Sequence, residues 1–278
     1  MLADSRFRKN VLIIGISSDI GKNLAQQYIA DGHCVIGTYR NQDFIKNIPG
    51  SSEHKLLQCD ISDTESIKSF CNNYQELSLP WDVLISCVGT LEPIGRFFNS
   101  DFDDWEKSVM TNSTSQLRVL HGIYPQRRKG EVSSVIFFAG GGTNGPFRNY
   151  SAYCIAKIAL IKMCELLDDE TDDLNICAIG TGFVRTKIHQ QTLANAEAAG
   201  KNYEKTREFL KSINNGTSMS DIYRCINWCV SHDKSIVGGR NFSIVHDPWN
   251  MVNIPFKEWL QKDENHFKLR RFGNEHYT

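Results

Sequence analysis

Short apolar runs alternate along this chain with longer mixed segments of polar and apolar residues. The apolar runs predict strands at residues 9–14, 33–38, 55–58, 81–86, 132–138, 174–179 and 240–245. Helices are expected between them at residues 22–31, 62–76, 102–124, 153–168 and 220–231. Strand and helix alternate without a linker or a repeat, which predicts an α/β fold. We expect one doubly wound parallel sheet of about seven strands with helices on both faces.

Two segments depart from this alternation. Residues 187–216 form a polar, helical, charge-rich stretch that is too long for a simple crossover, and we expect a lid or insertion there. The tail, residues 248–278, contains two tryptophans and a basic-aromatic stretch near its end. We expect a single domain over residues 1–278 that carries both segments.

Composition narrows the classes of function. Of the 278 residues, 41% are hydrophobic and 23% charged, as in an ordinary globular protein, and the net charge of −1 offers no electrostatic attraction for nucleic acid or an anionic membrane. The apolar runs are too short to cross a bilayer, and the first ten residues lack the apolar stretch of a signal peptide. Nine cysteines without a C-x-x-C pair indicate reduced thiols in a cytoplasm, and no cluster has metal-ligand spacing.

A glycine-rich turn follows the first predicted strand and precedes a helix. Its residues run from Gly15 to Gly21 as Gly-Ile-Ser-Ser-Asp-Ile-Gly. Gly15 would permit a tight turn, and Gly21 would let the helix pack closely on the strand, so that the helix N-terminus faces a pyrophosphate. Asp19 would either cap the helix or repel that phosphate. A plain strand–helix turn without a ligand is the alternative.

Further candidate residues stand at the ends of later strands. The second strand ends in Tyr39 and Arg40 without an acidic residue, so a 2′-phosphate is favoured over a free ribose, and NADP over NAD. Asp60 would accept from an adenine or cap the next helix. Gly89 would let a cofactor approach the backbone closely after the fourth strand.

The stretch from Tyr150 to Lys157 carries the candidate chemistry. Tyr153 and Lys157 are four residues apart, so in a helix they lie one turn from each other on one face. A nearby ammonium favours the phenolate, and we expect Lys157 to lower the pKa of Tyr153 toward neutrality. Tyr153 would then exchange a proton with a carbonyl or an alcohol oxygen. Asn112 would order a water chain or hold a bent helix.

In the order and spacing of these motifs, residues 10–247 resemble the short-chain dehydrogenase/reductase family, which has a Rossmann-type NAD(P)-binding fold. The resemblance implies that Tyr153, Lys157 and Asn112 are catalytic, and that the segment from Thr181 to Thr186 contacts the nicotinamide end of the cofactor. The cofactor-binding residues implied by motif and resemblance are Gly15, Ser17, Ser18, Asp19, Ile20, Gly21, Tyr39, Arg40, Asp60, Ile61, Cys87, Val88, Gly89, Tyr153, Lys157, Gly182, Val184 and Thr186.

The chain departs from the family pattern at the catalytic serine, which lies about a dozen residues before the tyrosine in the family. Ala139 and Gly140 stand there instead, followed by Thr143 as the nearest hydroxyl, and these three are the candidate substrate residues. The family's serine supports the substrate oxygen. We expect that Gly140→Ser restores this donor, unless the loop requires glycine. Thr181 also replaces the usual proline of the family.

The function that follows is an NADP(H)-dependent oxidoreductase, with NAD(H) as the alternative cofactor, acting on a small-molecule carbonyl/alcohol pair. A similarity to members from bacterial surface-polysaccharide pathways implies a sugar or a nucleotide sugar. The rival is a cofactor-binding sensor or scaffold without turnover; a third alternative is loss of nucleotide binding. The family also implies a homodimer or homotetramer formed by the helices at 102–124 and 152–168, where apolar surface is expected from Leu117, Leu120, Ile158 and Ile161.

Overall fold

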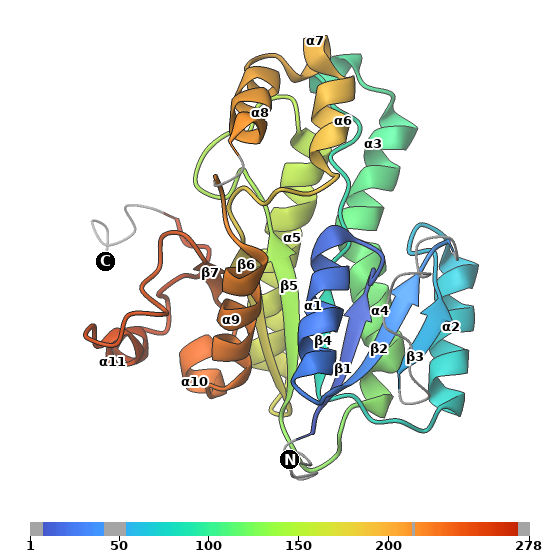
Figure 1. Ribbon diagram of the computed structural model, residues 1–278, viewed down its shortest axis with the longest axis vertical. Helices are drawn as coiled ribbons and strands as arrows, with labels where there is room; N and C mark the ends of the chain where they lie inside the picture. The colour runs from blue at the N-terminus through green and yellow to red at the C-terminus, as the bar shows by residue number, and fades with distance from the viewer. Residues whose placement is uncertain (1–7, 42–53, 213–214, 272–278) are drawn as a thin grey trace.

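One parallel sheet of seven strands forms the centre of the molecule, in the order β3-β2-β1-β4-β5-β6-β7 (Figure 1). The computed structural model describes residues 8–41, 54–212 and 215–271. The strands are β1 (Asn10–Ile14), β2 (Cys34–Tyr39), β3 (Lys55–Gln58), β4 (Val83–Ser86), β5 (Ser133–Ala139), β6 (Leu174–Gly180) and β7 (Asn241–Ser243). All seven lie where the apolar runs predicted strands, and the predicted doubly wound parallel sheet is confirmed.

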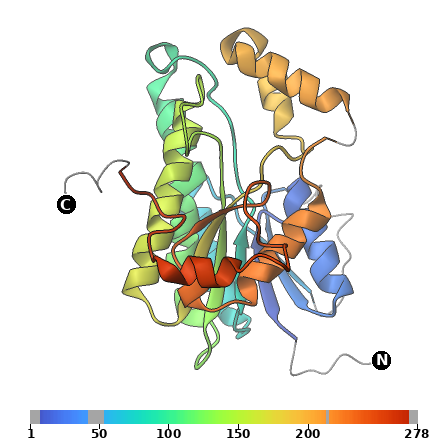
Figure 2. The ribbon, with the colours of Figure 1, turned by 90° about the vertical axis from the view of Figure 1, so that its left-hand side faces the viewer.

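Helices cover both faces of the sheet, as expected from strands that are apolar on both sides (Figures 1 and 2). Along β1, Val11 and Ile13 pack with the core beneath one layer, and Leu12 and Ile14 with the core beneath the other. The first layer contains α1 (Asp19–Ala30) and α9 (Met219–Val230), and the second contains α2 (Thr64–Glu76), α4 (Ser115–Ile123) and α5 (Ser151–Glu170).

The helix expected at residues 102–124 is interrupted. It consists of α3 (Phe102–Val109), a π-helical turn at Met110–Thr114 and α4, preceded by η3 (Phe97–Asn99) and followed by η5 (Tyr124–Gln126). Asn112 lies in the π-helical turn, and its Nδ2 donates to the carbonyl of Ser108 four residues earlier at 3.0 Å. A side chain that bonds within the helix in this way is a known cause of helix bending.

The long segment between β6 and α9 folds into α6 (His189–Ala194), α7 (Ala196–Ala199) and α8 (Lys201–Lys211). These helices stand beyond the carboxyl ends of the strands (Figure 1). They contact the loop before α5, where Tyr150 Oη and Thr192 Oγ1 share a hydrogen bond of 3.0 Å and Asn149 donates to the Ala198 carbonyl at 2.7 Å. Residues 213–214 of the predicted lid lie outside the described residues.

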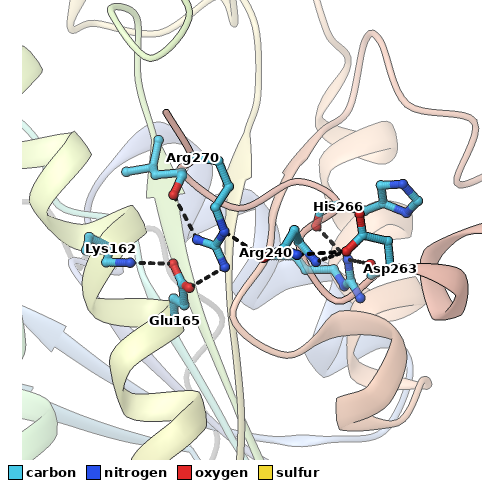
Figure 3. Close-up of polar contacts among 8 residues, drawn as sticks. Lys162, Glu165, Arg240, Asp263, His266 and Arg270 are labelled. Carbon is cyan, nitrogen blue, oxygen red and sulfur yellow. Dashed lines mark hydrogen bonds and ion pairs between the residues drawn. The ribbon is translucent and has the colours of Figure 1, made fainter. Parts of the chain in front are cut away.

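The C-terminal segment packs along the β7 side of the sheet and includes α11 (Phe256–Lys262), with α10 (Lys234–Val237) just before β7. The buried Arg240 donates to the carbonyl of His266 at 2.5 Å (Figure 3) and to the carbonyl of Leu260 at 2.9 Å. Arg270 donates to Glu165 of α5 at 2.7 Å, and hydrogen bonding from Arg270 lowers the pKa of Glu165 to about 2. The end of the predicted tail, residues 272–278, lies outside the described residues.

No helix among the described residues is long and apolar enough to cross a membrane. All nine cysteines are free thiols, and six of them are buried in the core: Cys34, Cys59, Cys164, Cys177, Cys225 and Cys229.

Candidate functional site

A cleft of about 1720 Å³ opens at the carboxyl ends of the parallel strands. Its walls come from the glycine-rich turn, the segments after β2, β4, β5 and β6, the start of α5, and α6. Ligands in sheets of this kind bind at this edge. Most of the residues singled out in the sequence line this one cleft, although they are spread from Gly15 to Thr186.

The glycine-rich turn requires glycine at both of its ends. Gly15 has φ +78°, and its N–H donates to Thr38 Oγ1 at 2.9 Å. A Cβ on Gly21 would lie 2.4 Å from the Gly15 carbonyl oxygen, so the helix is packed directly on the turn. Ser18 is the N-cap of α1 and accepts from the Gly21 N–H at 3.0 Å. The N-terminus of α1 thus opens on the cleft and fits the pyrophosphate of a dinucleotide cofactor.

Asp19 does not cap α1, although capping was one of its two predicted roles. Its Oδ2 accepts from the backbone N–H of Lys187 at 2.6 Å, across the cleft. Ser17, Ser18 and Ile20 line the cleft beside it. The opposite wall carries Gly182, Val184 and Thr186, which also line the cleft.

The adenine side of the predicted site is only partly in the cleft. The exposed Arg40 lines it, as do Cys59, Ile61 and Ser62. Tyr39 is buried in the core and does not line the cleft. Asp60 Oδ1 accepts from the N–H of Ser62 at 2.9 Å and from its hydroxyl at 2.7 Å, so this carboxylate stabilises the turn before α2.

Asn112 anchors the loop after β4 from behind the cleft wall. Its side chain is fully buried; Oδ1 accepts from Thr90 N–H at 2.9 Å, and Nδ2 donates to the Thr90 carbonyl at 2.9 Å. A Cβ on Gly89 would lie 3.6 Å from Asn112 Oδ1 and 4.0 Å from Lys157 Nζ. The bond to the Ser108 carbonyl within the helix fits the predicted role of holding a bent helix, whereas the two bonds to Thr90 were not predicted. Cys87 and Val88, which precede Gly89, line the cleft.

Tyr153 and Lys157 lie one turn apart on α5, with Lys157 Nζ 5.9 Å from the centre of the Tyr153 ring. Lys157 Nζ also donates to the Val88 carbonyl at 3.4 Å. Burial lowers the pKa of Lys157 to about 8 and raises the pKa of Tyr153 to about 12. The expected lowering of the Tyr153 pKa is therefore wrong for this structure, because burial of the phenol disfavours its charged form.

The loop after β5 explains why a serine is absent before the tyrosine. A Cβ on Gly140 would lie 2.3 Å from Tyr153 Oη and 2.5 Å from its Cε1, so the tyrosine ring occupies the space of a side chain. Of the two outcomes expected for Gly140→Ser, this contact favours the clash, because the new side chain would have to displace the Tyr153 ring. Ala139 and Thr143 also line the cleft, and the Thr143 hydroxyl donates to the Gly140 carbonyl at 3.3 Å.

Several cleft residues had no signal in the sequence. Gln191 of α6 accepts from Leu91 N–H at 2.8 Å and donates to Thr90 Oγ1 at 3.0 Å, which joins α6 to the loop after β4. Thr38, Ser62 and Lys187 were likewise missed. Gln191 and Leu91 are 100 residues apart, so a local pattern could not reveal the contact.

Known proteins resemble this chain over most of its length. The NADPH-dependent pterin aldehyde reductase of Arabidopsis thaliana is 21% identical over 193 residues, which are 68% of this chain and 80% of the relative. A short chain dehydrogenase/reductase structure from Saccharomyces cerevisiae is similar with a TM-score of 0.76 and 22% identity, covering 86% of this chain and 97% of that chain. A Shigella flexneri short chain dehydrogenase complexed with NADP gives a TM-score of 0.71 with 18% identity, over 85% and 97% of the two chains.

The family model for short chain dehydrogenases matches residues 9–197. This match covers more than half of the chain and includes the glycine-rich turn, Asn112, Tyr153 and Lys157. The similarity to the solved structure from Saccharomyces cerevisiae covers 86% of this chain, so the shared fold extends beyond residues 9–197. The chain with this cleft is therefore a member of the short-chain dehydrogenase/reductase family, and so an NAD(P)-dependent oxidoreductase that interconverts carbonyls and alcohols.

Proposed function

We propose that this protein is an NADP(H)-dependent reductase in which Tyr153 donates the proton to a substrate carbonyl. The observation that carries the proposal is that Tyr153 and Lys157 line the same cleft as the glycine-rich turn and Arg40. The bound nicotinamide would supply the hydride. The chain itself would supply the proton, the position of the carbonyl and the exclusion of water.

Tyr153 is suited to act as the proton donor when the reaction runs in the direction of reduction. Burial raises the pKa of Tyr153 to about 12, so the phenol keeps its proton at neutral pH. A protonated phenol is a proton donor and suits a carbonyl oxygen that gains negative charge. The Lys157 ammonium lies 5.9 Å from the ring centre and would stabilise the phenolate that remains after the transfer.

The preference for NADP(H) over NAD(H) rests on Arg40. This side chain is exposed and lines the cleft directly after β2, where an acidic residue would favour NAD. A guanidinium pairs well with a phosphate dianion, and such a charged contact contributes about 1.5–3 kcal/mol. The NADPH-dependent relative and the NADP-bound structure are consistent with this preference.

The proposed substrate is a small, hydroxyl-rich carbonyl compound such as a sugar or a nucleotide sugar. Polar side chains line the cleft from the loop after β4, the loop after β5 and the α6–α8 segment, and they suit hydroxyl groups: Glu92, Asn144, Gln191, Asn195 and Asn202. The α6–α8 segment would act as the lid over this substrate. Free thiols throughout are consistent with a reducing cytoplasm.

The test begins with fluorescence titrations of NADPH and NADH into the purified protein, followed by a screen of aldehydes, ketones and sugars. NADPH is expected to bind about tenfold or more tightly than NADH, and Arg40→Ala should abolish that difference. Equal affinities in the parent protein would contradict the proposed preference.

The proton-donor role is tested separately with Tyr153→Phe, which keeps the ring and removes the hydroxyl. The rate of carbonyl reduction should fall about 10²–10⁴-fold while the affinity for NADPH stays the same. A variant that keeps full activity would overturn the assignment of Tyr153. Cofactor binding without turnover across the whole screen would favour the sensor instead.

A further inference from the structure

Two hydrogen bonds join the opposite walls of the cofactor cleft at the glycine-rich turn. Asp19 Oδ2 accepts from the backbone N–H of Lys187 at 2.6 Å, and Lys187 Nζ donates to the Ser17 carbonyl at 3.1 Å. Asp19 is the first residue of α1, and Lys187 stands between β6 and α6, directly after Thr186. All of these residues line the cleft.

The Asp19 carboxylate is not needed to cap its own helix. Ser18 is the N-cap residue, and its side chain accepts from the Gly21 N–H. The carboxylate is directed instead to a segment that is 168 residues away in the sequence. A negative charge is stabilised near the N-terminus of a helix, so the carboxylate is favourable in this place before any ligand binds.

We propose that Asp19 is a positioning residue that holds the segment from Thr186 to Ile188 against the glycine-rich turn, so that the cofactor cleft is formed in advance. The inference rests on the proposed binding of the cofactor by this turn. A wall that is already in place does not have to be ordered when a ligand binds, and the affinity is higher by the cost that is avoided.

This role and the repulsion expected from the sequence predict opposite results. If the carboxylate mainly repels the pyrophosphate, its removal should tighten the binding of a dinucleotide. If the carboxylate mainly holds the opposite wall, its removal should weaken binding, because the segment after β6 loses its bond to α1. The sign of the change in affinity therefore separates the two roles.

Two substitutions separate the effect of the negative charge of Asp19 on cofactor affinity from the effect of its hydrogen bond to Lys187. Asp19→Ala removes both, whereas Asp19→Asn keeps an oxygen that accepts from Lys187 N–H and removes the charge. Dissociation constants for NADPH and NADH are measured by cofactor fluorescence. Asp19→Ala should weaken both cofactors by about tenfold or more and by the same factor, because they share the pyrophosphate and nicotinamide halves.

Asp19→Asn should bind both cofactors within about threefold of the parent, since a neutral acceptor keeps most of the bond. Asn23→Ala is the matched control, because it changes another side chain in the first turns of α1 that does not line the cleft, and its affinities should equal those of the parent. Thermal melting of each variant, followed by circular dichroism, shows whether α1 and the sheet remain folded.

Tighter binding by Asp19→Ala would overturn the inference and support repulsion, and unchanged binding would overturn it without supporting repulsion. Equal losses in Asp19→Ala and Asp19→Asn would also overturn it, because the charge and not the bond would then be decisive. Failure of the proposed cofactor site would give a different result. A folded parent protein that binds neither NADPH nor NADH would contradict the cofactor site, and the proposed role of Asp19 would then be contradicted as well.

Discussion

The contact between Gly140 and Tyr153 shows how one residue's missing side chain shapes the site. The tyrosine hydroxyl lies where a Cβ on Gly140 would be, with only 2.3 Å between the two positions. A separation this short is not tolerated between non-bonded atoms, so a serine at position 140 would have to displace the ring. The position of the Tyr153 ring therefore requires a residue without a side chain at position 140. A hydrogen-bond donor for the substrate oxygen has to come from another residue of the cleft.

Gly140→Ser should consequently lower the rate of carbonyl reduction, by about 10²-fold if the phenol is moved out of reach of the substrate. The rate is measured with the best substrate from the screen at saturating NADPH. Gly145→Ser is the control on the same loop, because no atom lies within 4 Å of a Cβ on Gly145, and its rate should match the parent. An active Gly140→Ser variant would mean that the loop relaxes around the new side chain.

The buried ammonium of Lys157 should destabilise the folded protein at neutral pH. Its side chain is 3% exposed, and burial lowers its pKa to about 8, against about 10.4 in an unfolded chain. Between these values the unfolded state binds more protons, so the free energy of unfolding rises with pH across this window. At pH 7 the lowered pKa of Lys157 corresponds to a free energy of unfolding that is about 3 kcal/mol smaller than it would be with an unshifted lysine.

Lys157→Met should therefore raise the free energy of unfolding at pH 7 by up to about 3 kcal/mol, and this advantage should shrink as pH rises from 8 to 10. Urea unfolding of both proteins at several pH values measures the difference. Lys162→Met, which changes a half-exposed lysine on the same helix, should show no comparable trend. An advantage that is constant with pH would contradict the buried charge as its cause.

At the scale of elements, the C-terminal segment depends on one buried arginine. Arg240 is 3% exposed and donates to the carbonyls of Asp263 and His266 (Figure 3) and to that of Leu260, which fixes the turn after α11 against β7. The next contact along the chain is a backbone hydrogen bond of 2.9 Å from Asn241 of β7 to the Phe267 carbonyl. The segment thus covers the outer edge of β7, which would otherwise expose unpaired backbone groups.

Arg240→Met should lower the free energy of unfolding by about 2–4 kcal/mol, because it leaves several carbonyls without a donor. Arg270→Met removes a partly exposed ion pair to Glu165 and should cost at most about 1 kcal/mol. Urea unfolding compares the two, and limited proteolysis after residue 262 reports release of the segment. Equal losses in both variants would show that Arg240 has no special role.

At the scale of the whole molecule, the exposed apolar side chains on α5 are the surface we expect to mediate self-association. Ile155 and Leu166 are 50% and 42% exposed, and their spacing places them on one stripe of the helix. Leu120 and Ile161, which were expected to provide this surface, are in the core instead. Leu117 and Ile158 are only partly buried.

We expect light scattering to give two or four times the chain mass of 31.6 kDa at micromolar concentration. Combined Ile155→Glu and Leu166→Glu should shift the mass toward the monomer, because charges on a buried contact are costly. Val252→Glu, at a side chain that is 96% exposed elsewhere, should leave the mass unchanged. A parent protein that is monomeric throughout would contradict the prediction.

The sequence alone determined the parallel sheet, the glycine-rich turn and the pairing of Tyr153 with Lys157. These features depend on short-range geometry: apolar runs set the strands, Gly15 takes a positive φ, and four residues make one helical turn. A bent helix was only one of two roles open for Asn112, and the π-helical turn itself was not predicted, because it depends on which side-chain bonds form when α3 and α4 pack beside α5.

Only the tertiary structure decided what the site residues contact and how they ionise. Asp19 accepts a hydrogen bond from Lys187, which is 168 residues away in the sequence, and Gly140 contacts the ring of Tyr153. Burial raises the pKa of Tyr153 and lowers the pKa of Lys157. Solvation and long-range contacts depend on how all the elements pack together. They are properties of the folded molecule that no local pattern of residues contains.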